Sequence, residues 1–333
     1  AAAGVPRRAA TAAAADDALA DYTPTTAFLF PGQGAQYVGM AKELVEEVPA
    51  AAELFSKASE ILGYDLLDVC VNGPAEKLNS TAVSQPAIYV SSLAAIEKLR
   101  MQEGGQDIID SCDVAAGLSL GEYTALTFAG ALTFEDGLKL VKIRGESMQA
   151  AADATPSGMA SVIGLDKETV GKLCDAANAD VDESETVEIA NYLCPGNYAV
   201  SGGIAGLEKV EEKAKPDFKA RMVVRLAVAG AFHTRFMEPA AEKLSEALAA
   251  TEITSPRIPV VSNVDVVPHS DPDTIRSILS KQLTGPVQWE DTLNTLISKG
   301  TERSFEIGPG KVIAGIVKRI DKAAFKAVTN VEA

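Results

Sequence analysis

The sequence predicts an α/β protein in which a large domain with a parallel sheet is interrupted by a small inserted α+β domain. Short apolar runs alternate with longer segments of helical periodicity in both outer parts of the chain, which favours a parallel sheet covered on both faces. From about residue 155 the order changes to strand, helix, strand, strand, helix, strand. That order is typical of a ferredoxin-like unit.

The large domain begins with a short buried strand at 25–30, TTAFLF, which ends at the turn PGQG. A helix is expected near 37–48, and apolar residues at helical spacing predict a long one over 84–102. The run DVAAG at 113–117 predicts a second strand, and helical spacing resumes at 122–132. A strand, a tight turn and a helix in succession form the repeating unit of a parallel sheet.

A further helix is predicted by the segment LTFEDGLKLVKIRGESMQAAA, which opens with Thr133 and Asp136 at the spacing of a capping box. Arg144 falls on the same face of this helix as Val141 and Met148. A guanidinium that points into the protein needs an anionic partner, because it cannot lose its proton. An internal carboxylate and the carboxylate of a bound substrate both remain open as that partner.

The small domain is placed at 154–226, and the large domain at 22–153 and 227–333. The predicted strands of the small domain are at 158–165, 187–193, 197–203 and 219–228, and its helices at 167–177 and 204–215. The large domain then resumes with expected strands at 258–264 and 303–310 and a closing helix at 311–320.

Composition limits the classes of function and location. The net charge of −16 over 333 residues argues against nucleic acid and anionic membranes as partners. The sequence contains no apolar run long enough to predict a transmembrane helix. Four scattered cysteines predict buried free thiols in a reducing compartment, and only two histidines argue against a metal site. We expect a monomer without a metal or redox cofactor.

The first 21 residues are rich in alanine, with two arginines and no acidic residue before Asp16. They lack the apolar core of a secretory signal. A remnant of an organelle transit peptide and a disordered leader are both compatible with this composition. We therefore exclude 1–21 from the predicted fold.

Ser119 lies in GLSLG, between the expected strand at 113–117 and the helix that follows it. A serine in a sharp strand-to-helix turn can act as a nucleophile, with Gly117 and Gly121 allowing close backbone approach. The backbone N–H of Leu120 can then face a developing oxyanion at the start of the helix. The alternative is a purely structural turn, but the strand before and the helix after it favour the nucleophile.

Any histidine base for Ser119 is either His233 or His269. His269 lies in the polar stretch VVPHSDPDT and is expected to be a solvated loop residue. His233 follows an apolar run predicted as a strand, and strand ends are where open α/β sheets build their sites. The base is therefore predicted to be His233.

The turn FPGQGAQ at 30–36 follows the first strand and lacks the spacing of dinucleotide or P-loop motifs. Its glycines would let the backbone N–H of Gln33 approach a reacting carbonyl. The glycine-rich turn EIGPGKVIAG at 306–315 is assigned a structural role.

Seven segments together, FPGQGAQYVGM, GLSLGEYTAL, IRGESMQ, GAFHT, SNVD, KQLTGPVQW and EIGPGKV, resemble the malonyl-CoA:acyl carrier protein transacylases of type II fatty acid synthesis. The resemblance runs in the family's order from about Phe28 to Ile320. It implies an α/β-hydrolase-like large domain and a ferredoxin-like small one. It also implies malonyl transfer from a coenzyme A thioester to acyl carrier protein by a ping-pong mechanism without a cofactor.

The resemblance implies that Ser119 carries the acyl group and that His233 is its base. The other roles it implies are oxyanion-hole amides from Gln33 and Leu120, binding of the malonyl carboxylate by Arg144, and orientation of the histidine by the backbone carbonyl of Gln282.

One position departs from the family, because Leu118 stands where most members have histidine before the nucleophile. The leucine form is similar to plant and algal plastid members, which favours the plastid stroma, with a bacterial-type cytoplasm as the alternative. The rival function is a serine esterase or thioesterase of α/β-hydrolase type. Such an enzyme would normally place its histidine near the C-terminus, whereas about a hundred residues follow His233 here.

Overall fold

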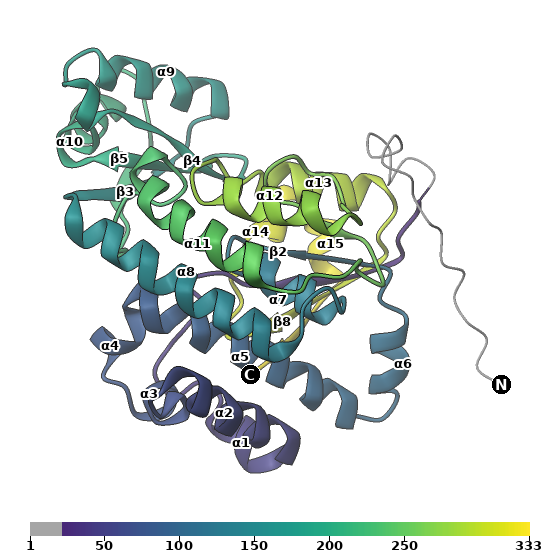
Figure 1. The fold of residues 1–333 in the computed structure, drawn as a ribbon. Helices are drawn as coiled ribbons and strands as arrows, with labels where there is room; N and C mark the ends of the chain where they lie inside the picture. Colours follow the sequence, from purple (N-terminus) through teal and green to yellow (C-terminus); the bar gives the residue numbers. More distant parts are fainter. Residues whose placement is uncertain (1–21) are drawn as a thin grey trace.

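The computed structural model describes residues 22–333, so the predicted leader at 1–21 lies outside the described residues. Within that range the chain forms one parallel sheet and one antiparallel sheet (Figure 1). The parallel sheet has five strands in the order β7-β2-β1-β8-β9. They are β1 Thr26–Phe30, β2 Val114–Gly117, β7 Val260–Val261, β8 Arg303–Gly308 and β9 Val328–Glu332.

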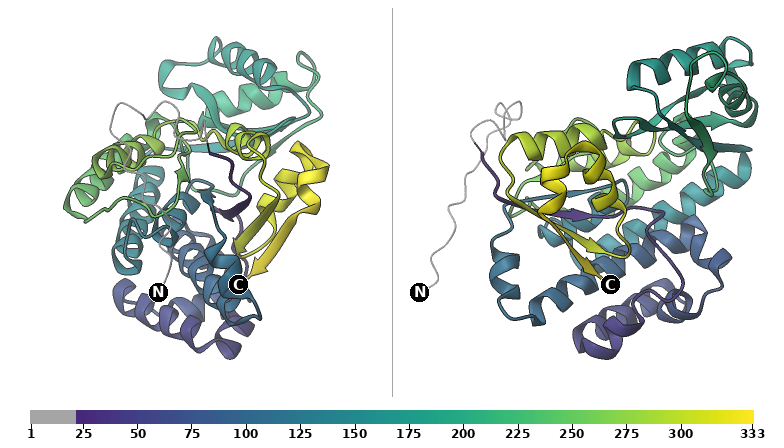
Figure 2. Two further views of the ribbon diagram at one scale, coloured as in Figure 1. Left: turned by 90° about the vertical axis from the view of Figure 1, so that its right-hand side faces the viewer. Right: turned by 180° about the vertical axis from the view of Figure 1, so that it is seen from behind.

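The parallel sheet is buried on both faces, because successive side chains of β1 point alternately into two separate apolar cores. Ala27 and Leu29 pack with α13 (Trp289–Ser298) and α14 (Val312–Ile320), whereas Phe28 and Phe30 belong to the larger core on the opposite face. That face is covered by α5 (Thr81–Met101) and α7 (Gly121–Phe128). Figure 2 shows the C-terminal helices in front of the sheet in its right-hand view. Burying each large apolar side chain contributes roughly 1.5–3 kcal/mol.

The remaining helices of the large unit surround this core. They are α1 Lys42–Glu47, α2 Pro49–Leu62, α3 Leu66–Asn72, α4 Ala75–Asn79, α6 Gly105–Asp110, α8 Phe134–Ala154, α11 Glu238–Ala250, α12 Pro272–Gln282 and α15 Lys322–Lys326, with a 3-10 turn at Arg235–Met237. The helix α8 packs between α5 and α11.

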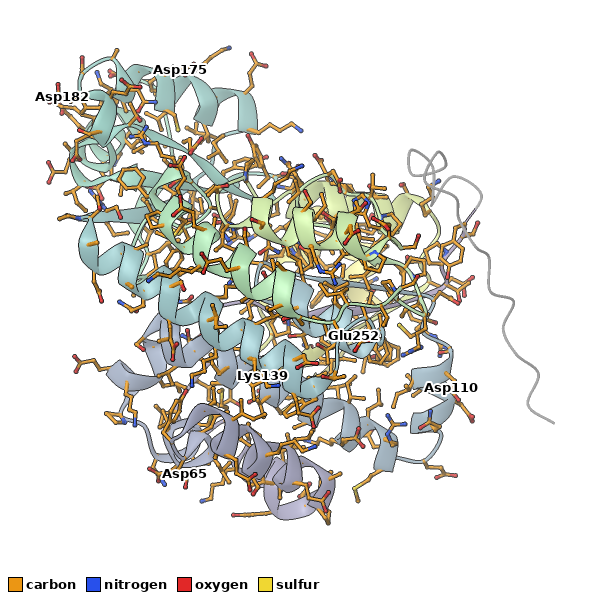
Figure 3. The ribbon with its side chains drawn as sticks, viewed as in Figure 1. Asp65, Asp110, Lys139, Asp175, Asp182 and Glu252 are labelled. Atoms are coloured by element: carbon orange, nitrogen blue, oxygen red, sulfur yellow. The ribbon has the colours of Figure 1, made fainter. Side chains whose placement is uncertain are left out.

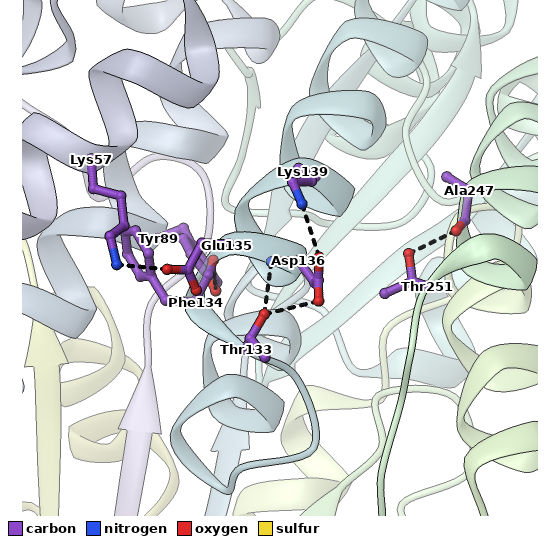
Figure 4. A network of polar contacts seen from close by, with 9 residues as sticks. All are labelled: Lys57, Tyr89, Thr133, Phe134, Glu135, Asp136, Lys139, Ala247 and Thr251. Carbon is purple, nitrogen blue, oxygen red and sulfur yellow. Dashed lines mark hydrogen bonds and ion pairs between the residues drawn. The ribbon is translucent and has the colours of Figure 1, made fainter.

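The start of α8 is fixed by the predicted capping box, which is confirmed (Figure 4). The Thr133 hydroxyl oxygen accepts a hydrogen bond from the backbone N–H of Asp136 at 3.1 Å. Glu135, in the same turn, forms an ion pair with Lys57 of α2 at 2.6 Å. Both side chains are exposed, so this pair contributes little to folding stability. A defined start sets which residues of α8 face inward, and Arg144 is among them.

The second sheet is antiparallel, with four strands in the order β4-β5-β3-β6. Its strands are β3 Ser157–Ile163, β4 Val187–Cys194, β5 Asn197–Gly203 and β6 Met222–Arg225. It also contains α9 Lys167–Asn178, a 3-10 turn at Glu183–Glu185 and α10 Ile204–Ala214. The chain order and strand order are those of a ferredoxin-like unit, so the predicted fold class is confirmed. The domain division at 154–226 stays a prediction.

Backbone hydrogen bonds join the antiparallel sheet to a segment of the large unit. Val287, just before α13, donates to the carbonyl of Ala190 at 2.8 Å and accepts from the N–H of Tyr192 at 3.0 Å. The segment before α13 therefore adds to the outer strand β4, and the small unit is anchored to the large one here.

Four predicted segments differ from the structure. The strand expected at 258–264 is confined to Val260–Val261. The strand expected at 219–228 is confined to Met222–Arg225, because the chain leaves the antiparallel sheet at Leu226. His233 therefore follows a loop and does not lie at the end of a strand of the parallel sheet. The helix α14 does not close the chain, since α15 and β9 follow and β9 pairs with β8. The helix near 37–48 begins only at Lys42, after backbone with positive φ at Ala41.

Figure 3 shows acidic side chains such as Asp65, Asp110, Asp175 and Glu252 at separate places on the exterior. These four acidic residues thus lie on or next to different helices and do not form one cluster. No helix within residues 22–333 is both long and apolar enough to cross a membrane. All four cysteines are free and buried, as predicted.

Candidate active site

The structure places Ser119 in a strained turn between β2 and α7. Its φ is 51°, a left-handed conformation that is uncommon outside glycine. A Cβ at Gly117 would lie 1.9 Å from backbone atoms of Gly121, and one at Gly121 would lie 2.2 Å from the carbonyl oxygen of Phe30. Both glycines are therefore needed for the strand, the turn and the helix to pack this closely.

The turn is held from the neighbouring strand by Asn263, which follows β7 and is fully buried. Its side-chain oxygen accepts from the backbone N–H of Ser119 at 2.6 Å, and its side-chain nitrogen donates to the carbonyl of Gly117 at 2.7 Å. These two bonds satisfy backbone groups that a sharp turn leaves without partners in regular structure. Asn263 therefore stabilises the conformation that presents the serine hydroxyl to His233 and Arg144.

His233 lies directly against this hydroxyl. Its Nε2 is 2.8 Å from Ser119 Oγ, and its Nδ1 is 2.7 Å from the backbone carbonyl oxygen of Gln282, the last residue of α12. A carbonyl oxygen can only accept, so Nδ1 carries the proton and the lone pair of Nε2 faces Ser119. This is the tautomer that can take a proton from the serine.

Burial, together with the nearby charge of Arg144, lowers the pKa of His233 from its usual value to about 4, against the opposite effect of the Gln282 carbonyl. The side chain is only 4% exposed. The imidazole is therefore neutral near pH 7, ready to accept a proton.

Arg144 reaches the same serine from α8, with 1% of its surface exposed. Its Nη2 donates to Ser119 Oγ at 3.0 Å and to Gln282 Oε1 at 2.9 Å, and its Nη1 donates to Gln85 Oε1 at 2.7 Å. Its guanidinium also lies 5.4 Å from the ring centre of Tyr123. Among residues 22–333 the hydrogen-bond partners of this cation are all neutral, so it has no internal carboxylate in contact.

The PGQG turn packs against the nucleophile turn, since a Cβ at Gly32 would lie 2.4 Å from the carbonyl oxygen of Leu118. The side chain of Gln33 donates to Thr81 at 3.3 Å. Within the described part of the chain, the backbone N–H groups of Gln33 and Leu120 have no hydrogen-bond acceptor. Both amides are thus free to donate to a bound group.

The sequence did not single out three residues of this network. Gln85 holds Arg144, Asn263 holds the turn, and Glu122 accepts from Gln282 Nε2 at 2.6 Å. Two of them lie inside segments that carried the family resemblance, GLSLGEYTAL and SNVD, which was the available signal. Burial raises the pKa of Glu122 to about 7, although its hydrogen bond from Gln282 acts in the opposite direction.

The other histidine is elsewhere. His269 Nε2 pairs with Asp265 at 2.9 Å, and its side chain is only 12% exposed. The expectation of a solvated residue was wrong in this respect, because the pair folds the ring onto its own loop. Within residues 22–333 no group of three or more His, Cys, Asp or Glu side chains is placed to hold a metal ion.

Comparisons with known proteins place this arrangement in a family. A model of the acyl transferase domain matches residues 27–331. The mitochondrial malonyl-CoA-acyl carrier protein transacylase of Homo sapiens is 41% identical over 91% of this chain and 79% of its own. The Bacillus subtilis malonyl CoA-acyl carrier protein transacylase is 42% identical over 89% of this chain and 90% of its own.

The fold agrees with these matches. The solved acyl-carrier-protein S-malonyltransferase of Bartonella henselae superposes with a TM-score of 0.86 at 36% identity, covering 93% of this chain and 96% of that one. The sequence matches span nearly all of the described residues, including both sheets and every residue of the site above. The chain therefore belongs to the malonyl-CoA–acyl carrier protein transacylase family of acyltransferases.

Proposed function

We propose that this protein transfers the malonyl group of malonyl-CoA to the phosphopantetheine thiol of acyl carrier protein, through a malonyl ester on Ser119. The observation that carries the proposal is the convergence of a neutral base and a buried cation on one hydroxyl. His233 Nε2 and Arg144 Nη2 lie 2.8 and 3.0 Å from Ser119 Oγ. The first supplies the proton transfers of acyl transfer, and the second suits an acyl group that carries a carboxylate.

In the first half-reaction His233 takes the Ser119 proton as Oγ attacks the thioester carbonyl. The C–S bond breaks after a tetrahedral intermediate forms, and the thiol of coenzyme A leaves with the proton from His233. The amides of Gln33 and Leu120 donate to the oxyanion of that intermediate. The Gln282 carbonyl keeps the neutral imidazole in the required tautomer and continues to accept from Nδ1–H while the ring is protonated.

The second half-reaction runs the same steps in reverse. His233 takes the proton of the phosphopantetheine thiol, whose sulfur attacks the malonyl ester. The C–O bond to Ser119 breaks, and Oγ recovers the proton. No oxidation or reduction occurs in either half, so the proposed chemistry requires no redox cofactor.

Arg144 is proposed to determine which acyl group the enzyme selects. Its buried charge is contacted only by neutral groups among the described residues, so a carboxylate arriving at its side of Ser119 gains a charge-assisted hydrogen bond. A neutral acyl group would leave the cation without an anion. A buried arginine is therefore better suited to malonyl than to a simple ester.

The alternative, a serine hydrolase, differs in what removes the acyl group. The decisive experiment isolates the malonyl-enzyme by rapid desalting and divides it among buffer, apo acyl carrier protein and holo acyl carrier protein. Transfer predicts rapid discharge only with the holo form, with malonyl recovered on its thiol. Equal loss in all three samples would establish hydrolysis instead, and the apo form controls for simple protein binding.

For location we propose the plastid stroma, with a bacterial-type cytoplasm as the alternative. The support is Leu118 at the position before the nucleophile, together with the composition of 1–21, which lies outside the described residues. The relatives named above are a mitochondrial and a bacterial protein. Import of the chain with its 1–21 segment into isolated chloroplasts, compared with isolated mitochondria, tests the proposal; uptake by mitochondria alone would contradict it.

A further inference from the structure

A buried carboxylate that the mechanism above does not use lies next to the site. Glu122 is in the first turn of α7 and is 3% exposed, without a cation in contact among the described residues. Its Oε2 accepts two hydrogen bonds, from Gln282 Nε2 at 2.6 Å and from the backbone N–H of Asn263 at 3.2 Å. A carboxylate is costly to bury, and both of its bonds lead to residues that hold the reacting groups.

The first of these bonds determines the orientation of the Gln282 amide. Its nitrogen donates one hydrogen to Glu122 and the other to the Ser119 carbonyl at 3.0 Å. Its oxygen is thereby directed at Arg144 Nη2, 2.9 Å away. An ionised carboxylate can only accept, so it selects the nitrogen side of the amide and excludes the flipped rotamer.

The backbone of the same glutamine holds the base, since its carbonyl oxygen accepts from His233 Nδ1. Gln282 therefore contacts the cation with its side chain and the base with its main chain. A shift of this residue would change the reach of both toward Ser119. Positioning errors of about 1 Å can cost roughly 100-fold in rate.

We propose that Glu122 is a positioning residue, which acts through Gln282 to hold Arg144 and His233 together at Ser119. This inference rests on the proposed function, because it is read out in malonyl transfer. Glu122 also accepts a hydrogen bond from the backbone N–H of Asn263. Because the side chain of Asn263 fixes the nucleophile turn, this second bond also helps to position Ser119.

The test compares Glu122→Gln and Glu122→Leu with the wild type at pH 8, above the Glu122 pKa of about 7. Glutamine keeps an acceptor oxygen in nearly the same volume, and leucine removes it. We expect Glu122→Gln to stay within about threefold in kcat/KM for malonyl-CoA. Glu122→Leu should lose about 10- to 150-fold, the range for losing a hydrogen bond to a charged group.

Glu306→Gln is the matched control, since Glu306 is an equally buried carboxylate that accepts from the start of α14 and from Asn330. It should leave kcat/KM within about twofold. If Glu122→Leu does not fold by circular dichroism, Glu122→Asp replaces it, because the shortened carboxylate withdraws from Gln282 and should lose about tenfold or more.

A double-mutant cycle separates positioning from a general structural role. With Gln282 already changed to Ala, Glu122→Leu should lower kcat/KM by no more than about twofold, because the route through Gln282 is gone and only the longer bond from the Asn263 N–H, at 3.2 Å, remains to be lost. A full additional loss in that background would overturn the proposal, as would a Glu122→Leu enzyme as active as the wild type. Failure of the wild type itself to form malonyl-Ser119 would instead overturn the proposed function.

Discussion

Two strands of the parallel sheet, β2 and β8, end in glycine-rich turns that lead into helices, and only one of these turns carries the proposed nucleophile. The β2 turn contains Ser119 at φ 51°, and the β8 turn contains Gly308 and Gly310 at φ 136° and 73°. Each turn has a buried glutamate nearby, Glu122 in one and Glu306 in the other. Both turns therefore combine positive-φ backbone with a nearby buried glutamate.

The two turns differ in which elements supply the hydrogen-bond partners of their side chains. Glu306 accepts from the N–H groups of Ile313 and Ala314, both at 2.8 Å, and from Asn330 at 2.9 Å, so it serves α14 and the adjacent β9. At the β2 turn the partners arrive from α5, α8, α12, the loop after β7 and the loop after β6. The comparison shows that the turn presents the Ser119 hydroxyl, while separate elements supply the groups that contact it.

The largest expected effect is at the centre of the β2 turn. Ser119→Ala should lower malonyl transfer to holo acyl carrier protein by about 10⁴-fold or more, because no covalent intermediate can form. At the β8 turn Lys311→Ala should change the rate less than about twofold. Transfer rates for the two purified variants test this contrast, and a Ser119→Ala enzyme with substantial transfer would break it.

Next in size is the effect of the cation delivered by α8. Arg144→Ala should lose about 10- to 150-fold in kcat/KM for malonyl-CoA, the range for a hydrogen bond to a charged group. Acetyl-CoA, which has no carboxylate, should lose much less. Kinetics with both thioesters measure the ratio, and an equal loss with the two substrates would make Arg144 structural.

The pH dependence of the base should give about a tenfold difference. In the Glu122→Gln variant, which removes the titration of the neighbouring carboxyl with a pKa of about 7, the lowered pKa of His233, about 4, should let the enzyme keep most of its kcat/KM at pH 5.5, where a histidine of ordinary pKa would leave about a tenth. The contribution of His233 to folding stability should be lost as the pH falls from about 6.5 to 4, since the unfolded chain binds that proton more readily, whereas Glu122, with its pKa raised to about 7, contributes in the opposite direction. A kcat/KM profile with an acidic limb near pH 6.5 would contradict the buried neutral base.

The smallest effect on rate is expected at the other turn. Glu306→Ala leaves helix N–H groups of α14 without an acceptor, which should lower the free energy of unfolding by about 1–3 kcal/mol per unsatisfied group. The rate per folded molecule should stay within about twofold. Urea unfolding and an assay of the folded protein separate the two quantities; a large fall in rate would mean that the turns are not independent.

The sequence was sufficient for the fold class because periodicity and turn residues are local signals. Strand lengths were less predictable, as at 219–228, because the end of pairing depends on the neighbouring strand. The strand β9 was missed for the same reason, since it lies at the edge of the sheet and only partly in the core.

The residues of the candidate site also differ in how far the sequence could predict them. Ser119 and Arg144 were identifiable because a glycine-flanked serine and a charge on an apolar face are conspicuous. The supporting residues were not, because Gln85, Glu122 and Asn263 act through partners far away in the sequence. Glu122 and Asn263, for example, are 141 residues apart. Such contacts follow from the packing of whole elements and leave no local pattern.

The central claim is that Ser119 accepts an acyl group that carries a carboxylate. The most direct measurement mixes the protein with malonyl-CoA alone, quenches in acid within seconds, and determines the intact mass with peptide mapping. The account predicts one malonyl group on the Ser119 peptide of the wild type and none on Ser119→Ala. A wild type without an adduct, or with the adduct on another residue, would contradict it.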